Sequence, residues 1–207
     1  MSPLTLIRPR RQLVVMARWP AAGRCKSRLA AGIGPEAAAR IQSRLSEHTM
    51  AAARQLGGID LVLAVSGLGP RGARRWGQSL GAHRAVPQGI GGLGSRMARQ
   101  LARAFGEGAQ QVLLIGTDLP LLSSADLEAA FAAFAQSPLV LGPASDGGYW
   151  LIGLTARRSS LLSGIPWGSN DVLRRTLERA AFEELDPALL AVHSDLDRPG
   201  DLEPWLG

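Results

Sequence analysis

The sequence predicts an α/β fold in which a mostly parallel sheet carries helices on both faces, giving three layers. Short runs rich in Val, Ile and Leu recur along the chain, and segments with apolar residues at helical spacing separate them. Strands that alternate with helices in this way lie parallel, because each helix returns the chain to the same end of the sheet. A length of 207 residues with 46% hydrophobic residues fits a single domain over residues 1–207.

The first predicted strand covers residues 12–17 (QLVVMA), a short apolar run followed by a loop that contains Pro20 and Gly23. Apolar positions then recur at helical spacing over residues 35–56. A proline suits the first turn of this helix, and two glycines follow its end. The β-branched run at residues 59–66 predicts the second strand.

The middle of the chain repeats this alternation. A helix is expected over residues 71–80, before a short extended segment at residues 83–87. The glycine-rich residues 89–94 precede a helix over residues 95–105, and the strongest strand signal follows at residues 111–116 (QVLLIG).

The last predicted elements begin with an alanine-rich helix. Ser123 and Asp126 have the spacing of a capping box, which places the start of that helix, and we expect it to reach residue 136. The remaining predictions are strands over residues 139–142, 149–154 and 191–193, and a helix over residues 170–181.

Composition excludes several classes of protein. Cys25 is the only cysteine, so one chain can form neither an internal disulfide nor a zinc site of cysteines alone. Every apolar run is broken before it reaches the ~18 residues of a membrane span. The N-terminal arginines are not followed by the apolar core of an export signal. We therefore expect a cytoplasmic protein without a membrane span.

The two halves of the chain have opposite charge. Residues 1–110 carry 17 basic and 4 acidic side chains, a balance of +13, whereas residues 111–207 carry 6 basic and 13 acidic side chains, a balance of −7. An anionic substrate held together with a divalent cation would use both halves, and arginines on solvated helices are the alternative. Nucleic acid is not an expected partner, because no basic stretch is interleaved with aromatic residues.

The loop at residues 17–29 (ARWPAAGRCKSRL), after the first predicted strand, is a candidate for phosphate binding. Gly23 lets the backbone approach a ligand. Lys26, the only lysine among 23 basic residues, and Arg28 lie at the start of a short predicted helix, whose amides favour anions. The loop lacks the pattern of a P-loop NTPase, and a solvated turn is the alternative.

Asp118 follows the strongest strand signal and is a candidate metal ligand. Ligands of parallel sheets bind beyond the carboxyl ends of the strands, and Mg²⁺ commonly takes one or two protein carboxylates together with substrate phosphates. The alternative is that Asp118 only caps its own turn within residues 116–122 (GTDLPLL).

A third candidate segment, residues 145–153 (SDGGYWLIG), places a carboxylate beside two aromatic rings. Tyr149 and Trp150 next to Asp146 could hold a sugar or a similar polar acceptor, although Asp-Gly-Gly is also an ordinary hairpin turn.

Further along the chain, Asp195 and Asp197 lie two positions apart on an extended segment. Their side chains therefore project to the same side and could bring a second carboxylate to the metal. Exposed acids before a short helix are the alternative.

Five motifs in this order resemble one known family. They are ARWPAAGRCKSRLA, GGLGSRM, GTDLPLLS, LGPASDGGYWLIGL and DLDRPGDL, and they extend over about residues 13–202. They are similar to the bacterial GT-A-like glycosyltransferase family of nucleotide-diphospho-sugar transferase type, whose members are associated with arsenosugar biosynthesis. Molybdenum-cofactor and phospholactate guanylyltransferases are more distantly similar. The resemblance implies a Rossmann-like nucleotide-binding sheet and a divalent cation, Mg²⁺ or Mn²⁺.

The resemblance also implies roles for individual residues. The nucleotide and its phosphates would contact Ala17, Arg18, Gly23, Lys26, Arg28, Gly94 and Arg96. The metal would bind Asp118 together with Asp197, or with Asp195 in its place. The acceptor would lie at Gly147, Gly148, Tyr149 and Trp150, with Asp146 as the catalytic base and Lys26 as the second catalytic group.

Two departures limit this transfer of roles. The first loop is not of the L-x-G-G-x-G-x-R-M type found in the nucleotidyltransferases. Asp118 is followed by Leu119 and Pro120, so the D-x-D motif usual in glycosyltransferases is absent. A second metal-binding carboxylate must therefore come from far along the chain.

These observations favour a metal-dependent transferase that moves a glycosyl group from a nucleoside diphosphate sugar to a small-molecule acceptor. A nucleotidyltransferase acting on a nucleoside triphosphate would use the same residues but release pyrophosphate, with Arg96 and Arg99 serving its acceptor. A non-catalytic nucleotide-binding module is the third hypothesis, and nucleotide affinity without metal dependence or product would identify it.

Overall fold

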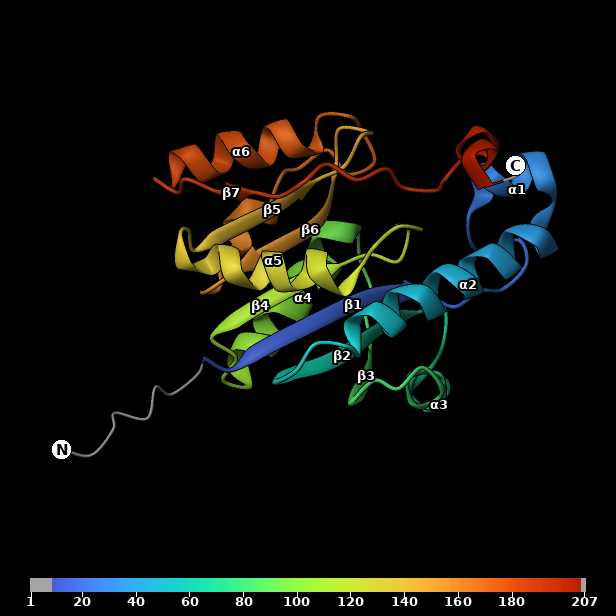
Figure 1. Ribbon diagram of the computed structural model, residues 1–207, viewed down its shortest axis with the longest axis horizontal. Helices are drawn as coiled ribbons and strands as arrows, with labels where there is room; N and C mark the ends of the chain where they lie inside the picture. Colours follow the sequence, from blue (N-terminus) through green and yellow to red (C-terminus); the bar gives the residue numbers. More distant parts are fainter. Residues whose placement is uncertain (1–8, 206–207) are drawn as a thin grey trace.

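A seven-stranded mixed sheet forms the centre of the protein (Figure 1). The structure is a computed structural model that describes residues 9–205, with side chains through residue 202. The strand order is β3-β2-β1-β4-β6-β5-β7. The strands are β1 (Arg11–Arg18), β2 (Ile59–Ser66), β3 (Arg84–Pro87), β4 (Gln111–Ile115), β5 (Leu139–Pro143), β6 (Tyr149–Leu154) and β7 (Ala188–Leu189). All neighbours pair in parallel except β6, which is antiparallel to β4 and β5. The predicted fold class is confirmed.

Helices cover both faces of the sheet (Figure 1). They are α1 (Ser27–Ile33), α2 (Pro35–Ala53), α3 (Pro70–Ser79), α4 (Leu93–Gly106), α5 (Ser124–Ala132) and α6 (Val172–Phe182). Three 3₁₀ segments add to them: η1 (Ala133–Ala135), η2 (Ser159–Leu162) and η3 (Pro199–Trp205). None of the helices within residues 9–205 is long and apolar enough to cross a membrane.

Alternate residues of β1 enter two separate hydrophobic cores, as expected for a strand buried on both faces. Leu13 and Val15 pack with residues of α2, α3 and α5 on one face of the sheet. Val14 packs with residues of α4 and α6 on the other face. The molecule therefore has the three predicted layers.

The antiparallel insertion of β6 determines where the functional residues gather. Ile115, the last residue of β4, is paired with Leu151 near the start of β6. Tyr149 and Trp150 therefore lie at the same edge of the sheet as the carboxyl ends of β1 and β4.

The predicted strand over residues 191–193 is wrong. The structure has β7 at Ala188–Leu189 instead, and His193 forms only an isolated bridge with Ala144. The backbone N–H of Leu190 donates to the Leu141 carbonyl, and the next ladder bond would need an N–H from Pro143. Proline has none, so the regular pairing stops there.

Two predicted helices are shorter than expected. The alanine-rich helix ends at Ala132 and continues to Ala135 only as a 3₁₀ turn. The helix predicted over residues 35–56 ends at Ala53, and the chain then turns before β2. Residues 1–8 and 206–207 of the predicted domain lie outside the described residues.

Candidate active site at the carboxyl ends of β1 and β4

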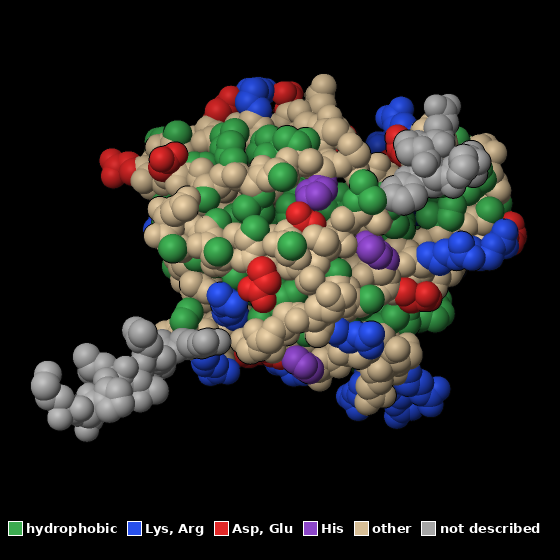
Figure 2. Space-filling view, in the orientation of Figure 1, with side chains coloured by type: hydrophobic (Ala, Val, Ile, Leu, Met, Phe, Trp, Pro, Cys, Tyr) green, Lys and Arg blue, Asp and Glu red, His purple; other side chains and the backbone are tan. Residues whose placement is uncertain are grey.

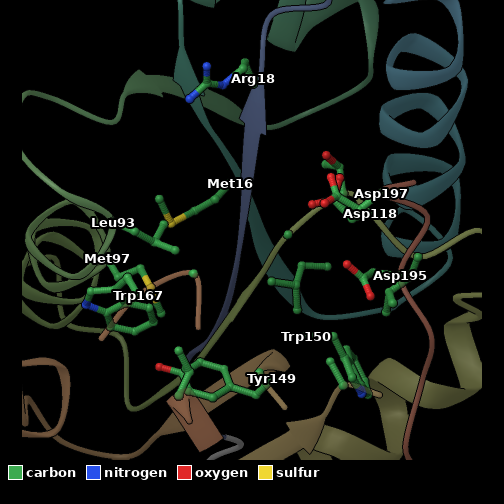
Figure 3. Close-up of a pocket in the computed structure, with 18 of the residues that line it drawn as sticks. Met16, Arg18, Leu93, Met97, Asp118, Tyr149, Trp150, Trp167, Asp195 and Asp197 are labelled. Carbon is green, nitrogen blue, oxygen red and sulfur yellow. The ribbon is translucent and has the colours of Figure 1, made fainter. Parts of the chain in front are cut away.

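A pocket of about 460 Å³ lies at the carboxyl ends of β1 and β4. Its walls come from the ends of these strands, the first turns of α4, the start of β6, the loop before α6 and the segment around residues 195–197 (Figure 3). The loop after β4 is held in place by a buried hydrogen bond of 2.9 Å, which the Gln42 amide of α2 donates to the Thr117 hydroxyl. This is the position at which open α/β sheets bind their ligands.

One side of the pocket is acidic. In Figure 3, Asp118 and Asp197 lie close together with Asp195 nearby, and Asp146 also lines the pocket. No basic side chain within residues 9–202 forms an ion pair with Asp146 or Asp195. Burial raises the pKa of Asp195, and the negative charges of Asp146 and Asp118 raise it further. These carboxylates are therefore close enough to repel one another.

Two carboxylates of this side are paired with cations from the loop after β1. The Lys26 Nζ lies 2.6 Å from Asp118 Oδ1, and the Lys26 side chain is only 3% exposed. The same Nζ donates to the Leu196 carbonyl. Arg28 forms a more exposed ion pair of 2.9 Å with Asp197. The predicted phosphate-binding cations thus contact the predicted metal ligands.

The C-terminal segment is fixed to the rest of the site by backbone and apolar contacts as well. The Leu196 N–H donates to the Asp118 carbonyl at 2.9 Å, and the buried Leu196 side chain packs among Leu29 of α1 and Leu45 of α2. The carboxyl side chain of Asp201 accepts from the backbone N–H groups of Asp197 and Arg198. These contacts hold Asp195 and Asp197 over the pocket.

A second side of the pocket is basic, with Arg18 at its rim in Figure 3. Arg96 of α4 donates to the side-chain oxygen of Gln88, whose amide in turn donates to the carbonyls of Ala17 and Ala64. Burial lowers the pKa of Arg96, and the neighbouring charge of Arg18 lowers it further. The Nε of Arg96 is buried without a partner, and neither arginine pairs with a carboxylate within residues 9–202. Two uncompensated cations facing one pocket favour an anionic ligand.

An apolar wall joins these two sides. It consists of Met16, Leu93, Met97, Tyr149 and Trp167 (Figure 3). The Tyr149 and Trp167 rings pack edge to face, with centroids 6.0 Å apart. Burial raises the pKa of the Tyr149 phenol, so it stays uncharged.

A second cavity of about 730 Å³ adjoins the first, because Arg18, Lys26, Ser66 and Asp197 line both. Its other walls include Trp19, Gly23, Arg24 and Arg28. Basic residues outnumber the one acidic residue among its lining, so the second cavity extends the basic side of the site.

The structure brings most of the predicted site residues to one place. Those that line the main pocket are Arg18, Lys26, Arg96, Asp118, Asp146, Gly148, Tyr149, Trp150, Asp195 and Asp197. Gly23 and Arg28 line the second cavity.

Four predicted residues line neither cavity. Arg99 donates instead to the backbone carbonyls of Gln88 and Ile90. Ala17 is buried in the core and contributes only its carbonyl, which accepts from Gln88. Gly94 lies buried behind Trp167. Gly147 packs against the backbone carbonyl of Asn170, so it supports the β5–β6 turn from outside the pocket.

Sequence reasoning did not assign a role to several lining residues. Met16, Gln88 and Trp167 line the pocket from outside the five motifs, and Met97 is the last residue of the motif GGLGSRM. Trp167 does stand between a proline and a glycine in a loop before a predicted helix, and that local pattern could have marked it.

The chain matches a single family model over residues 49–169, more than half of its length. That family is described as an uncharacterized protein conserved in bacteria, DUF2064. This chain belongs to the DUF2064 family.

Two relatives extend the comparison. A protein from Desulfovibrio desulfuricans G20, assigned as a nucleotide-diphospho-sugar transferase, superimposes on this DUF2064 chain with a TM-score of 0.84 and 26% identity, covering 94% of this chain and 85% of the other. The curated phosphoenolpyruvate guanylyltransferase of Chloroflexus aggregans is 27% identical over 128 residues, which are 57% of this chain and 59% of that protein. The match therefore spans less than two thirds of the guanylyltransferase.

A third structure shares the fold. Glucosyl-3-phosphoglycerate synthase from Mycobacterium tuberculosis was solved with Mn²⁺, UDP and glucosyl-3-phosphoglycerate. It aligns with a TM-score of 0.57 and 15% identity, covering 93% of this chain and 74% of the synthase. The Desulfovibrio protein and the guanylyltransferase are transferases, which confirms the predicted transferase class. The predicted nucleotide-diphospho-sugar transferase fold is also confirmed, and the synthase, at 15% identity, shares the fold alone. The association with arsenosugar biosynthesis stays a prediction.

The acidic side of the DUF2064 pocket is suited to a divalent cation that substrate phosphates help to hold. Among the residues that the structure describes, no three His, Cys, Asp or Glu side chains form a metal-binding group. Asp118 is half exposed to the pocket, and its charge acts on Asp195. Mg²⁺ in nucleotide sites commonly takes one or two carboxylates together with phosphate oxygens. The donor set therefore fits Mg²⁺ or Mn²⁺ only together with a phosphate-bearing ligand.

Proposed function

We propose that this DUF2064 protein transfers a glycosyl group from a nucleoside diphosphate sugar to a small-molecule acceptor, with a divalent cation bound at Asp118. The observation that carries this proposal is the division of one pocket into a basic side and an acidic side. A diphosphate needs cations around it, and a divalent cation needs carboxylates. The pocket offers both within reach of one ligand.

The nucleotide part of the donor has room along the basic side. Arg18 and Arg96 face the main pocket, and Arg24 extends the positive charge into the second cavity. The planar guanidinium group donates two parallel hydrogen bonds to phosphate oxygens. The Trp19 ring in the second cavity provides a flat apolar surface for a nucleobase. We infer that the nucleotide extends across both cavities.

Catalysis in this arrangement is mainly electrostatic. Mg²⁺ or Mn²⁺ at the Asp118 side would stabilise the negative charge that develops on the departing diphosphate. Arg18 and Arg96 donate hydrogen bonds to the same developing charge, in a pocket with an apolar wall that includes Tyr149 and Trp167.

Asp146 is the proposed base. The acceptor hydroxyl forms a bond to the anomeric carbon of the sugar, the bond between that carbon and the diphosphate breaks, and the hydroxyl proton passes to Asp146. Its Oδ1 already accepts a hydrogen bond of 2.8 Å from the Gly148 N–H, which fixes the carboxylate in the turn. Trp150, buried beside the turn, gives the acceptor an aromatic surface.

The charge around Asp146 favours a neutral acceptor. Asp146 and Asp195 lie at this end of the pocket, and no basic side chain within residues 9–202 forms an ion pair with either. A phosphate or carboxylate acceptor would be repelled here, whereas a hydroxyl compound would not. This supports glycosyl transfer over the use of an anionic acceptor such as phosphoenolpyruvate.

Nucleotidyl transfer is the second candidate. Arg18 and Arg96 are free of carboxylate partners within residues 9–202, and they could hold an anionic acceptor beside a nucleoside triphosphate. The guanylyltransferase relative supports this alternative. The two reactions differ in the released product, which is a nucleoside diphosphate in one case and pyrophosphate in the other.

Ligand-dependent melting tests the proposal. We would measure the melting temperature with a panel of nucleoside triphosphates, diphosphates and diphosphate sugars, each with and without Mn²⁺. A ligand at ~100 times its Kd stabilises the folded state by about 2.7 kcal/mol, which corresponds to roughly 5–10 °C for a chain of this size. We expect such a shift with a diphosphate sugar and Mn²⁺ together.

Two variants give the matched comparison. Asp118→Asn should lose the Mn²⁺-dependent part of the shift, whereas Asp186→Asn, the same change at an exposed site remote from the pocket, should keep it. A shift with triphosphates alone, followed by pyrophosphate release, would establish nucleotidyl transfer instead. No shift with any nucleotide would contradict both candidates.

A further inference from the structure

Lys26 is enclosed between two oxygen acceptors. Its side chain is 3% exposed, its Nζ lies 2.6 Å from Asp118 Oδ1, and the same Nζ donates to the Leu196 carbonyl, 170 positions away in the sequence. An ammonium group in this position is not presented to the pocket as a free phosphate ligand. It serves first as the counter-ion of Asp118.

The backbone at Lys26 is unusual in a way that supports a specific role. Its φ of 48° lies in the left-handed region. Among the described residues other than glycine, only Glu184 shares this conformation. A left-handed conformation is strained for a residue with a Cβ, and surrounding contacts must maintain it. The contacts of Lys26 with Asp118 and Leu196 are such contacts.

The ion pair lies where a metal is expected. Asp118 is half exposed to the pocket. The nearby carboxylates of Asp146 and Asp195 form no ion pair within residues 9–202, although the Lys26 charge also acts on Asp195. A divalent cation at Asp118 would approach the carboxylate that already holds the Lys26 ammonium. Two positive charges on one carboxylate repel each other, and the burial of the Lys26 side chain reduces the screening of its charge.

We propose that the Lys26 ammonium is an internal counter-ion that competes with the divalent cation for Asp118, so that the metal binds tightly only together with the nucleotide. The proposal rests on the metal-dependent donor site described above. Negative phosphates offset the repulsion between the ammonium and the metal. Metal and nucleotide therefore strengthen each other's binding by the same factor, as linkage requires. In this competition Lys26 is a positioning residue, and its hydrogen bond to the Leu196 carbonyl also holds the C-terminal segment next to Asp118.

A titration with Mn²⁺ alone tests the competition, with unbound Mn²⁺ measured by electron paramagnetic resonance. Lys26→Met removes the charge and keeps most of the length of the side chain. We expect it to bind Mn²⁺ about tenfold more tightly than the parent protein, because a unit positive charge beside the carboxylate is gone. Lys26→Arg keeps the charge and should bind Mn²⁺ as weakly as the parent.

Arg24→Met is the matched control. Arg24 belongs to the same loop and lines the second cavity, and no carboxylate within residues 9–202 pairs with it. Removing this charge should change Mn²⁺ affinity by less than about twofold, since solvent screens a charge at a distance. If Lys26→Met does not show a normal melting transition, Lys26→Gln removes the charge while keeping a donor for the Leu196 carbonyl.

Unchanged or weaker Mn²⁺ binding in the uncharged Lys26 variants would overturn the proposal, as would an equal gain in Arg24→Met or undetectable Mn²⁺ binding in every variant. The titration contains no nucleotide, so its failure is distinct from failure of the proposed transferase activity, which the nucleotide melting panel detects.

Discussion

Gly94 shows how the absence of one side chain shapes the pocket. A Cβ at this position would lie 2.4 Å from the Trp167 indole nitrogen and 2.8 Å from the Leu162 carbonyl. Only glycine lets α4 approach the loop that carries Trp167, and this approach places the Trp167 ring in the pocket wall (Figure 3). Direct contact of Gly94 with the nucleotide stays a prediction.

Gly94→Ala should therefore destabilise the protein. Because the backbone carbonyl of Leu162 cannot move as a side chain does, we expect a loss of about 1–3 kcal/mol in urea unfolding. Gly106→Ala is the control in the same helix, since a Cβ there meets nothing within 4 Å. That change should be neutral or stabilising by up to ~1 kcal/mol. Equal effects of the two changes would show that packing against Trp167 is unimportant.

Individual residues differ in how far the sequence reveals them. Asp118 can be placed in the pocket because it follows a clear buried strand, and sheets of this type bind ligands there. The contact of Lys26 with Asp118 cannot be predicted, because it depends on a left-handed backbone that the residue type disfavours. The sequence marks Trp167 by its place between Pro166 and Gly168, but nothing local indicates that its loop packs against α4.

At the scale of elements, local signals predict helix starts better than strand pairing. The capping box at Ser123 and Asp126 is present as predicted, with the Ser123 side chain accepting from the Asp126 N–H and the Asp126 carboxylate accepting from the Ser123 N–H. The hairpin turn before β6 indicates that β6 runs antiparallel to β5. The insertion of β6 beside β4 and the early end of β7 depend on partners far along the chain. Alternation of strands and helices gives no sign of either.

Ser123→Ala measures what the capping box contributes to α5. It removes the acceptor for the Asp126 N–H, and we expect unfolding to become easier by about 1 kcal/mol. Ser124→Ala, one position along, removes only an exposed hydrogen bond to Gln55 and should cost less than ~0.5 kcal/mol. Urea titration of both variants makes the comparison. An equally small loss in Ser123→Ala would mean that tertiary packing alone determines where α5 begins.

At the scale of the whole molecule, the opposite charges of the two halves meet at one site. Figure 2 shows basic side chains gathered over the α2 and α3 region of one face, and Arg71, Arg74 and Arg75 of α3 are exposed. The fold places Arg18 and Arg96 from the basic half in the same pocket as Asp118 and Asp195 from the acidic half. The charge pattern of the sequence thus anticipates the two-sided pocket, although it does not show which arginines take part.

A network away from the pocket makes global stability depend on pH. Arg84 of β3 bonds to Asp60 of β2 and to Glu107 after α4, and Gln12 of β1 also donates to Asp60. Burial alone would raise the pKa of Asp60, but hydrogen bonds from Arg84 and Gln12 outweigh it and lower the pKa. The hydrogen bond from Arg84 is the main cause of the lowered pKa of Glu107.

The melting temperature should therefore fall as the pH drops below ~4.5, where these carboxyl groups take up protons in the unfolded chain before the folded one. The stabilisation by this network is present at pH values above the ordinary pKa values of Asp and Glu. It is lost as the pH falls through the lowered pKa values of Asp60 and Glu107. Arg84→Gln should make the melting temperature depend less steeply on pH between about 5 and 3, the range that includes the ordinary pKa values of Asp and Glu. Arg174→Gln removes one of the hydrogen bonds that lower the pKa of Glu178. Solvent screens this exposed ion pair, so the change should affect the slope less than Arg84→Gln does, and equal slopes in both variants would contradict the assignment.

The contacts that close the pocket also constrain the order in which the protein can mature. All seven strands have been synthesised by Leu189, whereas Lys26 and Arg28 need Leu196 and Asp197, which lie 170 and 169 positions further along the chain. Synthesis from the N-terminus therefore produces all the strands before the segment that completes the acidic side of the pocket. A chain truncated after residue 190 would keep all seven strands and lack Asp195, Leu196 and Asp197.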